Sequence, residues 1–139
     1  MTLQREQSAP TGSPRRMTNE EFFAFVERPE NKDVIFQLFD GLVYPPITEG
    51  IPLPMPAPSP LHNYILGRLY FFIVGFLIQH QIGGAAFTEN VDYVLTPGTV
   101  VQADVSYVAA ERLNLGVKRF EFAPDLAVEV KSPGNEPIE

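Results

Sequence analysis

Hydrophobic positions follow a helical spacing in two segments of the chain, one short and one long. In the short segment, Thr18 and Glu21 form a capping box, and Pro29 marks where the helix should end. Its apolar residues fall on one side: Phe22, Phe25 and Val26. The pattern predicts a short amphipathic helix that lies on a sheet.

The long segment begins at Ser59-Pro60, a good N-cap and first-turn pair, and continues to Gly83-Gly84. Its apolar residues keep a helical spacing: Leu61, Ile65, Leu69, Phe72, Ile73, Phe76 and Leu77. The second half is apolar almost all round, which predicts burial against the sheet and against either the first helix or another subunit. A homodimer is therefore one hypothesis. The longest apolar run, Leu69–Ile78, is about half of the roughly 20 residues that cross a bilayer, so no membrane span is expected.

Strand-like segments account for much of the remainder. Val34–Phe39 and Leu42–Tyr44 flank Asp40-Gly41, a pair that accepts the positive φ angles of a tight hairpin turn. Three more strands are predicted after the long helix: Ala86–Leu95, Val100–Val108 and Asp125–Lys131. This order predicts a chain of the α/β class in the broad sense, that is, an α+β arrangement in which helices flank a mixed sheet. Pro45–Pro58, with six prolines, should be an ordered loop or an extended connection. A small-molecule site in a proline-lined pocket is a weaker hypothesis.

Length and composition indicate one folded domain, since the 139 residues are 45% hydrophobic and 12% aromatic. Residues 1–16 are polar and are expected to form a disordered tail ahead of a domain over residues 17–139. The absence of cysteine excludes disulfides and thiolate zinc sites, and it fits a cytoplasmic protein. The net charge of −7 argues against a protein that coats nucleic acid, while a transient DNA contact stays possible.

Asp104, Glu129 and Lys131 are the chemistry-bearing residues of the last two predicted strands. Side chains alternate along a strand, so Glu129 and Lys131 project to one face. If the two strands pair, Asp104 joins them. Two carboxylates and a backbone carbonyl, that of Val130, would form an oxygen cage suited to Mg²⁺. Lys131 could hold a water and offset charge on a phosphate, which is the division of labour expected for phosphodiester hydrolysis.

Other interpretations of these residues stay open. A buried ion pair of Lys131 with Asp104 or Glu129, with no reaction attached, explains the same pattern. His62, in the first turn of the long helix, could face the site or contact phosphate, although we favour a solvated helix start. Glu89 could approach the site as a third carboxylate or occupy an edge-strand surface.

Several motifs resemble those of a known family over most of residues 17–135. They are Met17-Thr18 to Glu21-Phe22, Leu38-Phe39-Asp40-Gly41, Pro58-Ser59-Pro60 with His62, Val100–Val105 containing Asp104, and Ala123-Pro124-Asp125-Leu126-Ala127-Val128-Glu129-Val130 ahead of Ser132-Pro133. Together they are similar to the Uma-two family of restriction-endonuclease-like proteins.

The resemblance implies a PD-(D/E)XK nuclease fold, with Asp104, Glu129 and Lys131 as its acidic pair and lysine. It implies a metal-dependent DNA endonuclease that uses Mg²⁺ or Mn²⁺ and binds DNA transiently. Gln37 stands where the family often carries Glu, and is a secondary candidate because its amide can hydrogen-bond a water. The last helix and strand of that fold are expected to be missing after Lys131. A catalytically inactive remnant or dimerisation module of the same fold is the alternative.

Overall fold

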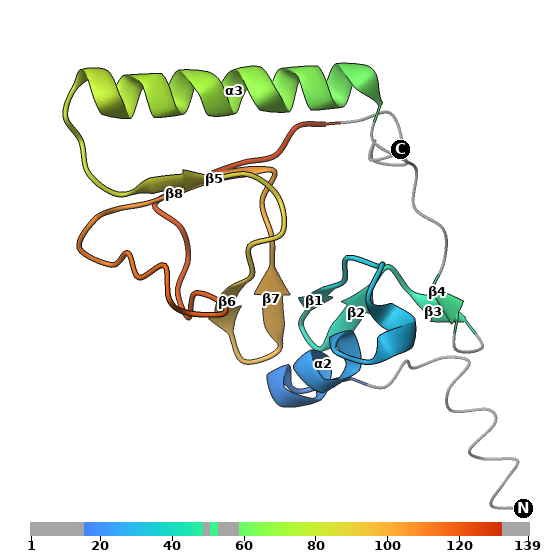
Figure 1. Cartoon of the computed structure of the whole chain (residues 1–139). Coiled ribbons are helices and arrows are strands. Elements are labelled where there is room, and N and C mark those ends of the chain that lie inside the picture. Colours follow the sequence, from blue (N-terminus) through green and yellow to red (C-terminus); the bar gives the residue numbers. More distant parts are fainter. Residues whose placement is uncertain (1–15, 49–50, 53–58, 132–139) are drawn as a thin grey trace, which may run out of the picture. The chain divides into compact units, whose positions relative to one another are not determined.

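The computed structural model describes residues 16–48, 51–52 and 59–131, so the predicted tail lies outside it except for Arg16. Its helices are α2 (Asn19–Val26), the 3-10 helix η1 (Pro29–Asn31) and α3 (Pro60–Gln79) (Figure 1). Its strands are β1 (Gln37–Phe39), β2 (Leu42–Tyr44), β3 (Ile47–Thr48), β4 (Ile51–Pro52), β5 (Ala85–Phe87), β6 (Tyr93–Thr96), β7 (Thr99–Val101), β8 (Val105–Val108) and β9 (Leu126–Val128). The predicted α+β architecture is confirmed.

Contacts divide the chain into two compact units, Met1–Pro54 with Leu95–Val101 and Met55–Val94 with Gln102–Glu139. Helix α2 of the first unit begins at the predicted capping box, in which Thr18 and Glu21 each accept the other's backbone N–H at 3.2 Å. The sheet order is β2-β1-β7-β6. The hairpin turn between β1 and β2 is confirmed, because Asp40 and Gly41 have φ angles of 48° and 80°. The most buried residues of this unit include Phe22, Leu38 and Val100.

Two short strands occupy part of the proline-rich segment. β3 and β4 pair antiparallel, with Ile47 opposite Pro52 and Thr48 opposite Ile51. The expected loop or extended connection is therefore a small ribbon over these residues. Residues 49–50 and 53–58 lie outside the described chain, and the proline-lined pocket stays a prediction.

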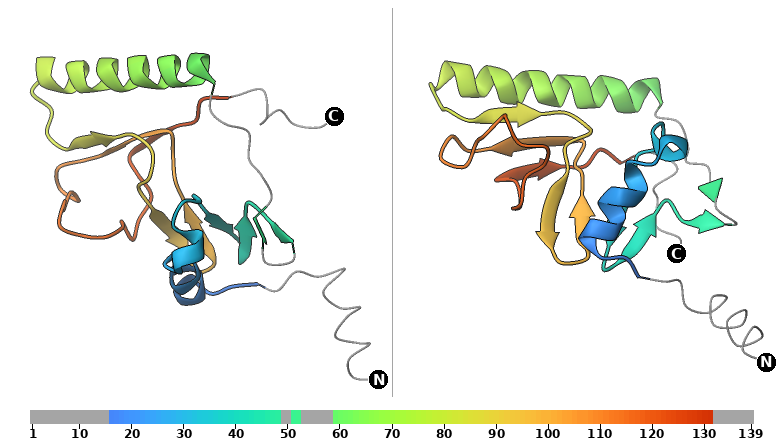
Figure 2. Two further views of the ribbon diagram at one scale, coloured as in Figure 1. Left: turned by 45° about the vertical axis from the view of Figure 1, so that its right-hand side comes forward. Right: turned by 60° about the horizontal axis from the view of Figure 1, so that its bottom comes forward.

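In the second unit, α3 packs on a three-stranded sheet of order β5-β8-β9, in which β8 is antiparallel to both neighbours (Figures 1 and 2). Leu66 of α3 forms a core cluster with Val105 and Val130. Residues alternate along β8, so Ser106 belongs to the other face of the sheet. There its hydroxyl lies 2.7 Å from the hydroxyl of Tyr93, whose ring stacks on Phe120. Both faces of this sheet are therefore packed.

Two long predicted strands are each divided in the structure. Ala86–Leu95 contains β5 and β6, which are separated at a position where Asn90 has a φ of 74°, a conformation that no pleated strand contains. Val100–Val108 contains β7 and β8, with a bend at Asp104. The first and last of the predicted strands are also shorter than predicted: β1 starts at Gln37 and β9 ends at Val128. These breaks place Glu89 and Asp104 outside the strand ladders, where their side chains can turn to a common site.

Helix α3 is covered on one side only. His62 and Leu66 are the buried residues of this helix, and the face turned away from the sheet exposes Phe71, Phe72 and Phe76. Burial of its other side against another subunit, one of the two alternatives predicted, stays a prediction. The helix has 20 residues, a mean hydropathy of 1.5 over its most apolar window and 6% of that window buried, so its length and composition would suffice to cross a membrane. Core helices of soluble proteins share these two properties.

Candidate metal centre

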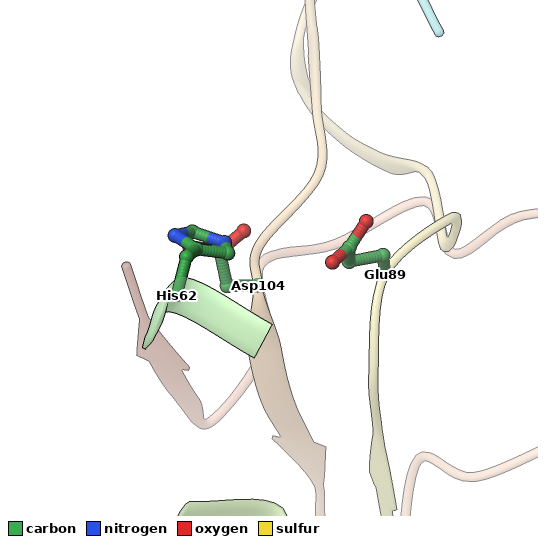
Figure 3. A group of neighbouring side chains, drawn as sticks. All are labelled: His62, Glu89 and Asp104. Carbon is green, nitrogen blue, oxygen red and sulfur yellow. Dashed lines mark ion pairs between the residues drawn. The ribbon is translucent and has the colours of Figure 1, made fainter. Parts of the chain in front are cut away.

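Three metal-capable side chains meet at the start of α3 (Figure 3). His62 comes from the first turn of the helix, Glu89 from the loop after β5, and Asp104 from the bend before β8. One possible ligand atom of each residue lies within 4.8 Å of the other two. Figure 3 shows the imidazole beside Asp104, with the carboxylate of Glu89 directed toward both.

The position of His62 follows from the local sequence. Ser59 caps the helix, and its hydroxyl accepts the backbone N–H of His62 at 3.1 Å, while Pro60 supplies a φ suited to the first turn. His62 is 8% exposed, so the solvated helix start that we favoured from the sequence is wrong. Its Nε2 lies 3.9 Å from Oδ2 of Asp104. Its Nδ1 is buried and has no hydrogen-bond partner among the described residues.

Asp104 and Glu129 are linked by two hydrogen bonds across the ends of β8 and β9. The backbone N–H of Val130 donates to Oδ2 of Asp104 at 2.7 Å. The backbone N–H of Asp104 donates to Oε1 of Glu129 at 3.3 Å. The two strands pair as the sequence argument required, with Val105 opposite Val128. Strand pairing therefore brings the two predicted acidic residues together.

The electrostatics of this cluster favour a cation. Burial, followed by repulsion from the Asp104 carboxylate, raises the pKa of Glu129 above its ordinary value, and Glu89 adds to this effect. The ion pairs found among the described residues bring no lysine or arginine to Asp104, Glu89 or Glu129. A group of carboxylates that lacks a basic partner is a common arrangement at functional sites.

The remaining predicted residues are placed differently. Lys131 is exposed and takes part in none of the ion pairs of the described chain, so the structure does not contain the buried ion pair considered above. Val130 is 7% exposed and packs on Leu66, and its carbonyl as a ligand stays a prediction. Gln37 lies in β1 of the first unit, and its part in the site also stays a prediction.

The donor set fits a divalent cation. Carboxylate oxygens are the protein ligands of Mg²⁺ and Mn²⁺, and an imidazole nitrogen is an accepted ligand of transition metals such as Mn²⁺. The unpartnered Nδ1 of His62 shows that this buried ring is not satisfied by protein groups of the described chain alone.

The sequence offers His62 and Glu89 only as secondary candidates, one that could face the site and one that could be a third carboxylate, and the structure brings both next to Asp104. Two signals were available. Ser59-Pro60 fixes the start of α3 and thereby the position of His62. Asn90 is a residue type that tolerates positive φ, and it marks the end of regular strand next to Glu89.

A family model with the description "Uma2: Putative restriction endonuclease" matches residues 20–139. Among curated proteins, none matches the chain. The matched range takes in α3, both strand ends of the acidic pair and every candidate site residue.

Proposed function

The chain belongs to the Uma2 family of restriction-endonuclease-like proteins, and from this premise we propose that it is a metal-dependent endonuclease that hydrolyses DNA phosphodiester bonds. One observation supports the proposal most strongly. Three carboxylates and one imidazole gather near the ends of α3, β5, β8 and β9 without a lysine or arginine that pairs with them in the described chain. Such a group of ligands is suited to a divalent cation, which DNA cleavage by a nuclease of this class would use.

In this proposal His62, Glu89 and Asp104 hold Mg²⁺ or Mn²⁺, and Glu129 contributes a further carboxylate from the adjoining strand end. The carbonyl of Val130 is a further candidate ligand. A divalent cation supplies positive charge that polarises a phosphate oxygen. Lys131, two residues beyond Glu129, would donate to the scissile phosphate and offset the charge that develops there. The hydrogen bond from the backbone of Val130 keeps the Asp104 carboxylate oriented toward the ligand group.

The test has two readouts. Mg²⁺ or Mn²⁺ should raise the melting temperature, because an ion that binds only the folded chain stabilises it by mass action. The same ions should support nicking of supercoiled plasmid DNA. Lys131→Ala should lower the nicking rate by roughly 10²–10³-fold, the effect of losing one charge-stabilising donor, and should keep the thermal shift. Lys118→Ala is the matched control because Lys118 is also an exposed lysine. No thermal shift in the parent chain would contradict the metal site.

A second candidate is a remnant that kept the fold and lost the reaction, and Gln37 favours it. This side chain stands at the start of β1, ahead of the turn, where it offers an amide in place of a carboxylate. A remnant should bind Mn²⁺ with a thermal shift and fail to nick DNA. Gln37→Glu should then restore metal-dependent nicking if this position caused the loss.

We also propose that the chain forms a homodimer, with an exposed face of α3 as its contact surface.

A further inference from the structure

The sides of α3 that the sheet does not cover expose several large apolar residues. Four aromatic side chains on this helix have exposed fractions of 55 to 65%: Tyr64, Phe71, Phe72 and Phe76. Three exposed aliphatic residues extend the surface: Leu61, Ile65 and Ile78. The one Lys or Arg residue of the helix is Arg68, whose guanidinium lies over the rings of Tyr64 and Phe72. Soluble monomers rarely expose contiguous apolar patches of more than a few hundred Å².

One row of this helix reads the same in both directions. Its members are spaced four residues apart and all are exposed: Asn63, Gly67, Phe71, Gly75 and Gln79. Residues at this spacing lie next to each other along a helix surface. A Cβ added at Gly67 or Gly75 would meet nothing within 4 Å, so the row is open above both glycines. The order is amide, glycine, phenylalanine, glycine, amide, with Phe71 at the centre.

We propose that this face of α3 binds the same face of a second copy of the chain, with the two helices antiparallel and a twofold axis at Phe71. A twofold contact places each residue opposite its mirror position in the row. Gly67 then faces the partner's Gly75, which lets the two backbones approach closely. Asn63 faces the partner's Gln79, so an amide pair can hydrogen-bond at each end. The two Phe71 rings meet at the axis.

The apolar area on the side of the row is limited. At about 100° per residue, Tyr64 and Ile78 lie about 20° from Phe71 around the helix axis, whereas Phe72 and Phe76 lie about 100° and 140° away. An aromatic side chain offers about 150–250 Å², so the exposed parts of Tyr64 and Phe71 present roughly 200–300 Å² together. This area fits a contact smaller than the roughly 800 Å² that each partner contributes to a standard interface. Beside the row lies a groove of about 390 Å³ with almost purely apolar walls, to which Phe72 and Phe76 contribute together with Tyr107 and Leu126.

A second copy fits this face better than a lipid bilayer does. A spanning helix turns all its sides to lipid or to other membrane helices, whereas Leu66 of α3 is already held by Val105 and Val130. Helices that lie in the membrane surface carry several Lys or Arg residues, whereas this helix has Arg68 alone in a chain of net charge −7. The palindromic row also matches a twofold partner, whereas contact with lipid would not require this order of residues.

The first experiment measures mass in solution by light scattering and sedimentation. The full chain is expected to be a dimer, and Phe71→Glu is expected to shift it to monomer by burying a charge at the axis. Leu115→Glu is the matched control, because Leu115 is exposed to a similar degree, 72% against 65%, and is not part of α3. Gly75→Leu should also weaken the dimer without lowering helix stability, since leucine is the better helix former. A monomeric parent chain, or a dimer that survives both α3 substitutions, would overturn the proposal.

The second experiment uses the absence of native cysteine. With oxidised glutathione, Phe71→Cys should form a disulfide-linked dimer, because the two residues meet at the axis. Gly67→Cys should not link to itself, since its two copies would lie about 12 Å apart along the helix axis. A mixture of Gly67→Cys and Gly75→Cys should link. Equal linking of Gly67→Cys alone would contradict the antiparallel register.

Flotation with phosphatidylcholine and phosphatidylglycerol vesicles separates the other occupant. The parent chain is expected to stay unbound, and flotation together with loss of the dimer would overturn the proposal. The inference does not depend on the proposed nuclease activity. Phe71 lies outside the metal centre, so Phe71→Glu should keep the Mn²⁺ thermal shift even as it abolishes the dimer.

Discussion

The two ends of β9 carry acidic residues in opposite electrostatic settings. Before the strand, Asp125 accepts the backbone N–H of Ala109 at 2.7 Å and pairs with Arg112 at 2.8 Å, and these contacts hold its pKa below the ordinary value. After the strand, Glu129 is crowded by other carboxylates, and burial together with Asp104 raises its pKa. The first end is electrostatically complete within the protein. The second end gathers carboxylates without a lysine or arginine partner among the described residues, which is the arrangement on which the proposed metal site depends.

The largest effect is expected from removing the charge of Asp104, at the end of the sheet where the carboxylates gather. Asp104→Asn keeps an oxygen that can accept the N–H of Val130 but removes the charge. A cation present at 100 times its Kd stabilises the fold by about 2.7 kcal/mol, and this gain should vanish in Asp104→Asn. Asp125→Asn should retain it in full. Calorimetry with and without Mn²⁺ decides the matter, and an undiminished gain in Asp104→Asn would remove Asp104 from the metal site.

Without metal, substitutions at the two ends of β9 should change the melting temperature in opposite directions. Glu129→Gln should raise the melting temperature, because it relieves repulsion from Asp104 and Glu89. The free energy of unfolding should rise by less than about 1 kcal/mol, since the side chain is partly exposed. Asp125→Asn should lower it, because Arg112 loses its partner. Both are measured by thermal unfolding in chelator. If the two substitutions changed the melting temperature in the same direction, the contrast between the strand ends would fail.

The smallest effect concerns acid. The pKa of Asp125 is lower in the folded chain than in the unfolded one, so its stabilising contribution is present above the unfolded pKa of about 3.9 and is lost as pH falls through the folded value. Asp125→Asn should therefore flatten the loss of stability below about pH 4. Urea unfolding at a series of acidic pH values measures this. Asp33→Asn is the control, because Asp33 is also an exposed aspartate.

Local signals in the sequence predicted most of the helices and turns. The capping box of Thr18 and Glu21 and the Ser59-Pro60 start of α3 are confirmed, because each depends on bonds within one turn. The Asp40-Gly41 turn is confirmed for the same reason. Strand lengths were less well predicted, since Asn90 and the bend at Asp104 interrupt runs whose composition alone favours extended structure.

The candidate site was predicted in part. Alternation and pairing of strands sufficed to bring Asp104 to Glu129. Alternation alone would give Ser106 the same face as Asp104, two residues before it. Ser106 is instead buried against Tyr93, because the chain bends at Asp104. Ser59-Pro60 places His62 in the first turn of α3, but its approach to Asp104 also depends on how α3 packs on the sheet, which is a tertiary contact.

The hydrogen bond from Val130 to Asp104 has a consequence for how this chain would tolerate mutation. Asp104 binds a backbone group at the end of the β8–β9 pair, whereas the side chains of His62 and Glu89 bind no backbone group in the described chain. A library selected for folding alone should therefore retain Asp104 and lose His62 and Glu89 readily. A retained Asp104 would then indicate only that the sheet folds. A retained His62 would be the better indicator that the proposed metal site is still under selection.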